Sequence, residues 1–239
     1  MEGHAARSAQ RVNNKRSIPV RPFITIVSGL PRSGTSMMMK MLVAGGMDAL
    51  TDDERLADED NPGGYFELQK VKEVGDDTSW LDDAKGRAVK MISRLLYSLP
   101  VGGGYKVIFM ERNLSEVAAS QRKMLERMGK EATEPDDVTI ALYVKHLAEV
   151  RELLAARPDM DVLYVSYNDT MTDPLTTADA VNSFLGGGLD VVKMTSVLDN
   201  SLYRNRADGQ AIAQPEATGP VSDEDDEAIK ERLKSLGYL

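Results

Sequence analysis

The stretch that most constrains the fold of this chain is an apolar segment that runs into a loop bounded by two glycines and then into a helix-forming segment, residues 23–36. The loop lies between Gly29 and Gly34. In this layout the backbone N–H groups of the loop and the positive end of the following helix converge on one point, where they bind a phosphate. We therefore expect a strand, a phosphate-binding loop and a helix in this order.

The two glycines have the spacing of the P-loop of nucleotide triphosphatases, but one functional residue differs. In those enzymes a lysine that grips the phosphate follows the second glycine. Here Thr35 stands at that position. The loop is therefore expected to hold a phosphate without the lysine of the hydrolases.

Strand patterns alternate with helix patterns along the rest of the chain. Further strands are expected at 87–92, 106–111 and 161–167, and helices at 36–44, 136–156 and 174–185. Repetition of strand and helix predicts a parallel sheet with helices on both faces. A length of 239 residues suits one substantial core. We expect a single-domain, three-layer α/β P-loop fold with a central parallel sheet flanked by helices.

Two candidate binding segments should meet at one edge of this sheet. Ligands of such sheets collect outside the carboxyl ends of the strands. The glycine-bounded loop follows one strand and Arg112 follows another. A helix is expected directly after Arg112, with Asn113 as its cap and Glu116 as the capping-box partner.

Composition excludes several classes of site. With 29 basic and 38 acidic residues, the net charge of −9 argues against a nucleic-acid or heparin-binding surface. There is no cysteine, so disulfides and thiolate zinc sites are excluded. The two histidines, His4 and His146, are remote in sequence from the phosphate loop, and His146 is expected at the surface. We therefore expect no metal site.

Four segments are expected along the chain. Residues 1–20 form a flexible basic tail, 21–206 the globular domain, 207–227 an acidic linker and 228–239 a short C-terminal helix. No segment reaches the ~20 consecutive apolar residues that a membrane span needs. The N-terminal residues lack the apolar core of a secretory signal. The expectation is a cytoplasmic protein.

The loop residues Pro31, Arg32, Ser33, Gly34, Thr35 and Ser36 resemble the 5′-phosphosulfate loop of sulfotransferases that use 3′-phosphoadenosine 5′-phosphosulfate (PAPS). Arg112 and Ser120, eight residues later, are similar in type and spacing to the family's arginine and serine that grip the cofactor's 3′-phosphate. Lys90 aligns with a family lysine directed at the transferred sulfuryl group. Arg204, in the segment 202–206, resembles a basic loop that folds over the cofactor in many members. The resemblance covers residues 23–206.

This resemblance implies a metal-independent, in-line transfer of a sulfuryl group from PAPS to an acceptor hydroxyl, or to an amine. Arg32 and Lys90 would then contact the bridging and sulfuryl oxygens, where permanent cations stabilise developing charge. Structural roles compete with these assignments. Arg112 could pair with a neighbouring acid, Arg32 could be a surface residue, and Lys90 could extend from its strand to solvent.

The transfer needs a general base, and here the chain departs from one branch of the family. Cytosolic sulfotransferases have a histidine two residues after the strand lysine, where this chain has Ile92. A carboxylate is therefore expected, as in the glycan and tyrosyl-protein sulfotransferases, which the chain resembles more closely. Asp52 ranks first among the candidates, followed by Glu67, and then by Asp53 and Glu59.

Two other functions stay open at this point. One is a nucleotide kinase or triphosphatase on a related P-loop, against which Thr35 argues. The other is a non-catalytic module of the same fold that binds adenosine 3′,5′-bisphosphate (PAP). The acceptor is not identified, because a match of fold transfers chemistry better than substrate. Four phenylalanines and one tryptophan disfavour a large flat aromatic acceptor.

Overall fold

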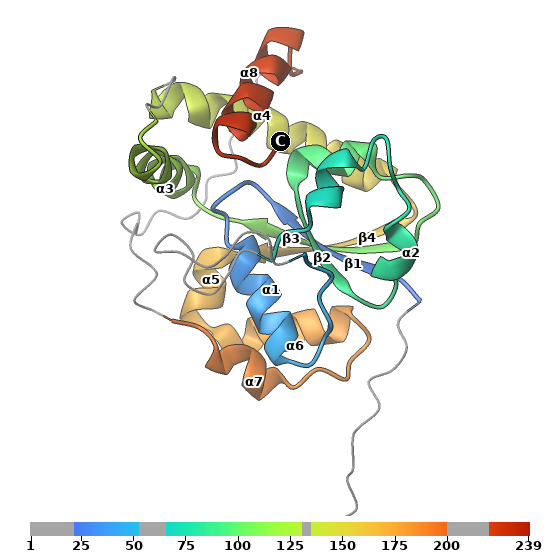
Figure 1. Cartoon of the computed structure of the whole chain (residues 1–239). Coiled ribbons are helices and arrows are strands. Elements are labelled where there is room, and N and C mark those ends of the chain that lie inside the picture. The colour runs from blue at the N-terminus through green and yellow to red at the C-terminus, as the bar shows by residue number, and fades with distance from the viewer. Residues whose placement is uncertain (1–21, 53–65, 131–134, 200–219) are drawn as a thin grey trace, which may run out of the picture.

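The computed structural model describes residues 22–52, 66–130, 135–199 and 220–239 (Figure 1). In this part of the chain a four-stranded sheet has the order β2-β1-β3-β4, and all neighbouring strands are parallel. The strands are β1 (Ile24–Gly29), β2 (Ala88–Ile92), β3 (Tyr105–Glu111) and β4 (Met160–Ser166). The expected α/β fold with a central parallel sheet is confirmed.

Strand β1 lies inside the sheet, and all of its residues are buried. It pairs with β2 on one side and with β3 on the other, so that Gly29 is level with Ile92 and with Met110. Strands covered on both faces are apolar throughout, which explains the continuous hydrophobic runs in the sequence. Because the strands are parallel and in this register, the loop after β1, the end of β2 and Arg112 after β3 leave the sheet at one edge.

Helices cover both faces of the sheet (Figure 1). Helices α1 (Thr35–Ala44), α6 (Pro174–Phe184) and α7 (Val191–Ser196) pack on one face. Helices α3 (Leu114–Arg127), α4 (Asp136–Ala156) and α8 (Asp223–Ser235) lie over the other. Shorter elements connect them: α2 (Leu81–Ala84), α5 (Tyr167–Thr172) and the 3-10 turns η1 (Gln69–Glu73) and η2 (Ser93–Ser98).

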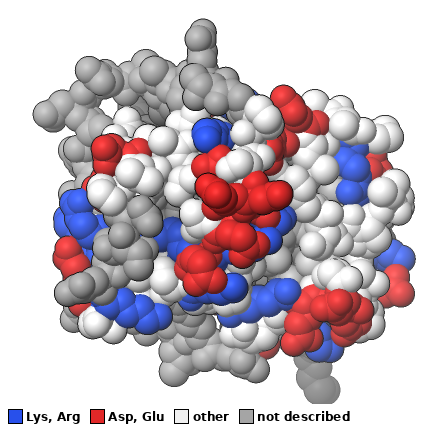
Figure 2. Space-filling model, turned by 90° about the horizontal axis from the view of Figure 1, so that it is seen from above, with Lys and Arg blue, Asp and Glu red and all other residues white. Residues whose placement is uncertain are grey.

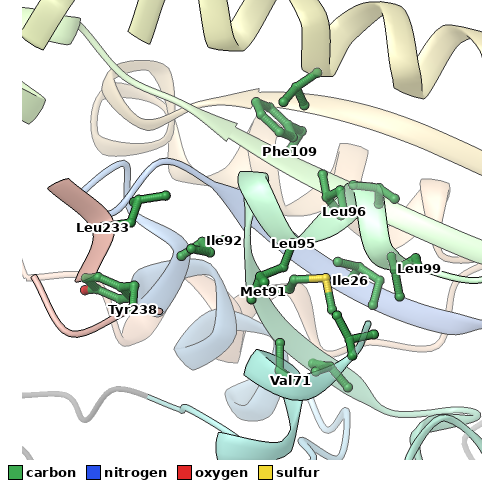
Figure 3. Close-up of a cluster of buried hydrophobic side chains, with 14 of the residues drawn as sticks. Ile26, Val71, Met91, Ile92, Leu95, Leu96, Leu99, Phe109, Leu233 and Tyr238 are labelled. Carbon is green, nitrogen blue, oxygen red and sulfur yellow. The ribbon is translucent and has the colours of Figure 1, made fainter. Parts of the chain in front are cut away.

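Each face of the sheet has its own apolar core. On the α1 side the methionines Met38, Met39 and Met41 are fully buried, as expected for unbranched side chains that fill irregular space under a crossover helix. On the other side Phe109 of β3 and Leu233 of α8 belong to one cluster (Figure 3). Helix α8 therefore packs into the same core as the sheet.

Helix α8 begins five residues earlier than the expected start at 228. The acidic run 223–227, expected in a linker, forms its first turn. The Ser222 hydroxyl accepts the N–H of Asp225, and the Asp225 carboxylate accepts the N–H of Ser222. Negative side chains are favourable at the positive end of a helix, so this run starts the helix instead of preventing it. Acidic side chains gather, with basic ones beside them, on the face seen from above (Figure 2).

The expected surface position of His146 is wrong. His146 is 2% exposed, and its Nε2 lies 2.9 Å from the Ser93 hydroxyl. Burial, with the positive charge of Arg94 nearby, lowers the pKa of His146 to about 4. Helix α4 is covered by the sheet and also by η2 and α8. Its buried face is the line of residues Thr139, Tyr143, His146, Val150 and Leu154, which recur every three or four positions.

Candidate functional site

The loop between β1 and α1 has a backbone that requires glycine at both ends. Gly29 has φ 146° and Gly34 has φ 104°. A Cβ at Gly29 would lie 2.5 Å from the Ser33 hydroxyl oxygen, and a Cβ at Gly34 would lie 2.5 Å from Cδ2 of Tyr167. Arg32 also has a positive φ of 73°. The chain is therefore wrapped tightly at the sheet edge before α1 begins, as the glycine spacing predicts.

This loop presents polar groups without exposing them widely. Ser33 is 2% exposed, and its hydroxyl has no hydrogen-bond partner among the described residues. A buried hydroxyl without a partner is costly unless a ligand or a water supplies one. Together with the N-terminus of α1, it is a fitting site for an anion.

The phosphate loop and the segment that carries Arg112 and Ser120 lie in contact. Nε of Arg32, in the loop, donates to the hydroxyl oxygen of Ser120 in α3 at 3.0 Å. Nη1 of Arg112 donates to the backbone carbonyl of Arg32 at 3.2 Å. Residues about 80 to 90 positions apart thus form one polar cluster at the carboxyl ends of β1 and β3.

Arg112 is held from two sides. Its Nε donates to the Glu116 carboxylate at 2.8 Å, and its guanidinium lies 4.2 Å from the centre of the Tyr167 ring. Burial raises the pKa of Tyr167, so that the ring stays neutral beside the cation. The neighbouring acid considered from the sequence is present, and it fixes the plane of the guanidinium.

Glu116 has a different partner from the one expected. Asn113 caps α3, and its Oδ1 accepts the N–H groups of Ser115 and Glu116 at 2.9 and 3.3 Å. The Glu116 carboxylate receives Arg112 and, at 3.5 Å, Nδ2 of Asn168. The buried carboxylate therefore orients the arginine.

The side chain of Lys90 extends from β2 to two polar partners. Its side chain is 4% exposed. Its Nζ lies 3.2 Å from the carboxylate of Glu67 and 3.3 Å from the hydroxyl of Ser36. A buried ammonium group needs such partners, because an unpaired charge is costly in an apolar strand. The lysine thus joins β2, the first turn of α1 and the segment that carries Glu67.

Two of the candidates for the general base, Asp52 and Glu67, lie among the described residues, and their surroundings differ. The Asp52 carboxylate accepts the N–H of Gln69, which begins η1. The backbone N–H of Asp52 and the hydroxyl of Thr51 donate to the carbonyl oxygen of Glu67 at 3.2 and 2.8 Å. Residues 51–52 therefore fix the backbone that presents Glu67 to Lys90. The other candidates, Asp53 and Glu59, lie outside the described residues, and so does Arg204.

A further set of residues supports the loop and was not identified from the sequence. Nε2 of Gln121 donates to the carbonyl oxygen of Pro31 at 3.0 Å. Its Oε1 accepts from the hydroxyl of Tyr143 at 2.8 Å and from Nε of Arg232 at 3.3 Å. The helical period of α3 places Gln121 on the buried face with Val117 and Met124, and a polar residue on that face is the signal that could have identified it.

The described residues contain no cluster of three or more histidine, cysteine, aspartate or glutamate side chains arranged to hold a metal ion. Among them, no helix combines the length and the apolar character required to span a membrane.

The family model described as "Sulfotransferase domain" matches residues 24–218. The structure is similar to that of mouse sulfotransferase SULT7A1 complexed with PAP, with a TM-score of 0.51, 16% identity, and coverage of 90% of this chain and 84% of that chain. Sulfotransferase STF1 from Mycobacterium tuberculosis matches with a TM-score of 0.47, 15% identity, and coverage of 90% and 77%. A search of curated proteins found no match.

Proposed function

Because the chain belongs to the sulfotransferase domain family, we propose that it transfers a sulfuryl group from PAPS to an acceptor hydroxyl, or to an amine, and releases PAP. One observation carries the proposal. The Arg32–Ser120 hydrogen bond joins the phosphate loop to the helix after Arg112, while Lys90 of the adjacent strand β2 pairs with Glu67 and reaches Ser36 of the first turn of α1. Groups for two phosphates and for the transfer are thereby gathered at one sheet edge.

The phosphate loop would hold the 5′ end of the donor. We assign this role to residues 31–36, whose backbone N–H groups and helix N-terminus suit an anion. The buried Ser33 hydroxyl, without a partner among the described residues, fits this assignment. PAPS supplies an activated sulfuryl group, so the loop has only to hold and orient it.

Arg112 and Ser120 would hold the 3′-phosphate. The guanidinium is fixed by Glu116 and by the ring of Tyr167, so little conformational freedom is lost when it binds a phosphate. The Ser120 oxygen accepts from Arg32. Its own O–H therefore remains available to donate to a phosphate oxygen. By the resemblance to the family, Arg204 would add a second cation to this end.

Arg32 and Lys90 would stabilise charge during the transfer. The acceptor oxygen forms a bond to sulfur while the bond between sulfur and the bridging phosphate oxygen breaks. Permanent cations near both oxygens lower the energy of that transition state. Lys90 is positioned for this by Glu67 and Ser36.

We propose Glu67 as the general base. Its carboxylate lies 3.2 Å from the Lys90 ammonium, and its side chain is 11% exposed. It would take the proton of the acceptor hydroxyl as the bond to sulfur forms. Asp52 ranked first from the sequence, but its carboxylate accepts a backbone N–H of η1. This contact favours Asp52 as a positioning residue for Glu67, and Asp53 and Glu59 remain as further candidates.

Ligand binding provides the first test of the proposal. PAP should raise the melting temperature more than AMP does at the same ligand concentration, because only PAP carries a 3′-phosphate and should bind more tightly. ATP with magnesium should have little effect. A larger shift from ATP with magnesium than from PAP would favour a nucleotide kinase or triphosphatase and would refute the proposal.

Transfer provides the second test. Radiolabelled PAPS is incubated with the protein and a panel of alcohols, phenols, sugars and amines, and the labelled products are counted. We expect transfer to at least one hydroxyl class. PAP binding without transfer to any member of the panel would favour a non-catalytic PAP-binding module.

A further inference from the structure

A small pocket lies at the end of β2, directly beside the proposed reaction centre. Its polar end is formed by Glu67 and Lys90. Most of its remaining wall is apolar: Leu68, Val71, Met91, Ile92, Leu95 and the ring of Tyr238. Figure 3 shows several of these side chains, including Val71, Ile92 and Tyr238, around one region. The pocket thus combines a carboxylate and a cation with a surface that suits a hydrocarbon.

The pocket is narrow because Tyr238 fills one side of it. Its cavity volume is about 30 Å³, which leaves room for about two water-sized groups. The centre of the Tyr238 ring lies 5.9 Å from Nζ of Lys90. An aromatic acceptor that approached Glu67 from this side would collide with the ring.

Tyr238 is held firmly by α8. Leu233 of this helix is 2% exposed and packs in the core on the same side of the sheet. The N-terminal turn is tied down by Asp226, whose two carboxylate oxygens accept from Arg94 at 2.9 and 3.0 Å. Because α8 is fixed at both its apolar face and its first turn, its end cannot move independently of the core.

The chain reverses after α8 and brings the tyrosine back to the pocket. Gly237 has φ 82°, and the N–H of Tyr238 donates to the carbonyl oxygen of Leu233 at 2.9 Å. Nζ of Lys72, from the opposite wall, donates to the carbonyl oxygen of Gly237 at 3.0 Å. This C-terminal turn is therefore linked to both sides of the pocket.

The tyrosine lies outside the region that the family model matches. That match ends at residue 218, whereas α8 begins at Asp223. The motifs that hold the donor all precede this point. The wall beside Glu67 is thus added by a segment beyond the family domain.

We propose that Tyr238 determines acceptor specificity by closing the apolar side of the acceptor pocket. This inference rests on the proposed sulfuryl transfer. The pocket then admits the hydroxyl end of a slender, uncharged aliphatic alcohol, which meets Glu67 beside Ile92 and Leu95. Bulky ring systems are excluded by the Tyr238 ring.

The test compares 1-hexanol with 2-naphthylmethanol as acceptors, with PAPS as the donor. For Tyr238→Ala the ratio of kcat/KM for 2-naphthylmethanol to that for 1-hexanol should rise at least about tenfold, because a clash of a few atoms is worth about that much. Tyr238→Phe keeps the ring and should keep the wild-type ratio. Leu154→Ala loosens the same apolar core from α4 and leaves α8 unchanged in sequence, so it should also keep that ratio.

A binding measurement separates this inference from the proposed function. The naphthalene fluorescence of 2-naphthylmethanol is followed during titration with each protein saturated with PAP, where no transfer takes place. Tyr238→Ala should bind this alcohol at least about tenfold more tightly than the wild type does. Unchanged affinity, or an equal gain in Leu154→Ala, overturns the inference. Failure of Tyr238→Ala to bind 2-naphthylmethanol overturns it too, even if transfer to another acceptor class upholds the sulfotransferase function.

Discussion

Replacement of His146 by glutamine should make the protein less sensitive to acid. The neutral imidazole is buried and hydrogen-bonded to Ser93. Burial opposes its protonation, the charge of Arg94 opposes it further, and the charge of Asp226 favours it. In the unfolded chain the imidazole is protonated below its ordinary pKa of about 6.5. As the pH falls below that value, the unfolded state therefore gains a proton that the folded state resists.

The size of the effect follows from the difference between the two pKa values. The folded value is about 4, so stability is complete above pH 6.5 and is lost progressively as the pH falls toward 4. For one group with these values the loss amounts to about 2 kcal/mol by pH 5 and about 3 kcal/mol by pH 4. Glutamine does not titrate and can still hydrogen-bond to Ser93.

Urea unfolding at pH 7.5, 6 and 5 measures the effect. The free energy of unfolding of the wild type should fall by about 2 kcal/mol more than that of His146→Gln between pH 7.5 and pH 5. Any pH-independent cost of the substitution cancels in this difference, and so does the titration of the carboxylates that both proteins share. Parallel curves for the two proteins would refute the argument that burial keeps His146 neutral.

Three further predictions concern the candidate site. Arg112→Ala should remove the preference for PAP over AMP in calorimetric titrations, a loss of about 1.5 to 3 kcal/mol for a charge-assisted contact; an equal loss for both ligands would contradict the assignment to the 3′-phosphate. Arg32→Ala and Lys90→Ala should lower kcat by roughly a hundredfold or more with little change in PAP affinity, whereas parallel losses would make them binding groups. Glu67→Gln should abolish transfer and leave PAP binding intact, while Asp52→Asn changes the rate by less than about tenfold; near-normal activity of Glu67→Gln would place the base elsewhere.

Local patterns predicted most of the fold. Each strand lies within one residue of its expected position at either end, because strands buried on both faces have continuous apolar runs. Helix α4 covers the expected range 136–156, which follows Pro135 and precedes Pro158. His146 was misjudged because the buried face of α4 runs through Thr139, Tyr143 and Val150, and His146 lies on that same line of the helix. The acidic start of α8 was missed because the same charges favour both a solvated linker and a helix N-terminus.

The sequence by itself determined the phosphate loop, because an apolar strand, two glycines at the spacing of Gly29 and Gly34 and a helix-forming segment follow one another directly. It also determined that a cation follows β3. Tertiary structure decided which groups meet. The Arg32–Ser120 bond joins residues that are 88 positions apart, and the Lys90–Glu67 pair joins residues 23 positions apart. The ring of Tyr238 lies beside Lys90, which is more than a hundred positions earlier in the chain. Such contacts depend on strand order and on helix packing, which a local pattern of neighbouring residues does not encode.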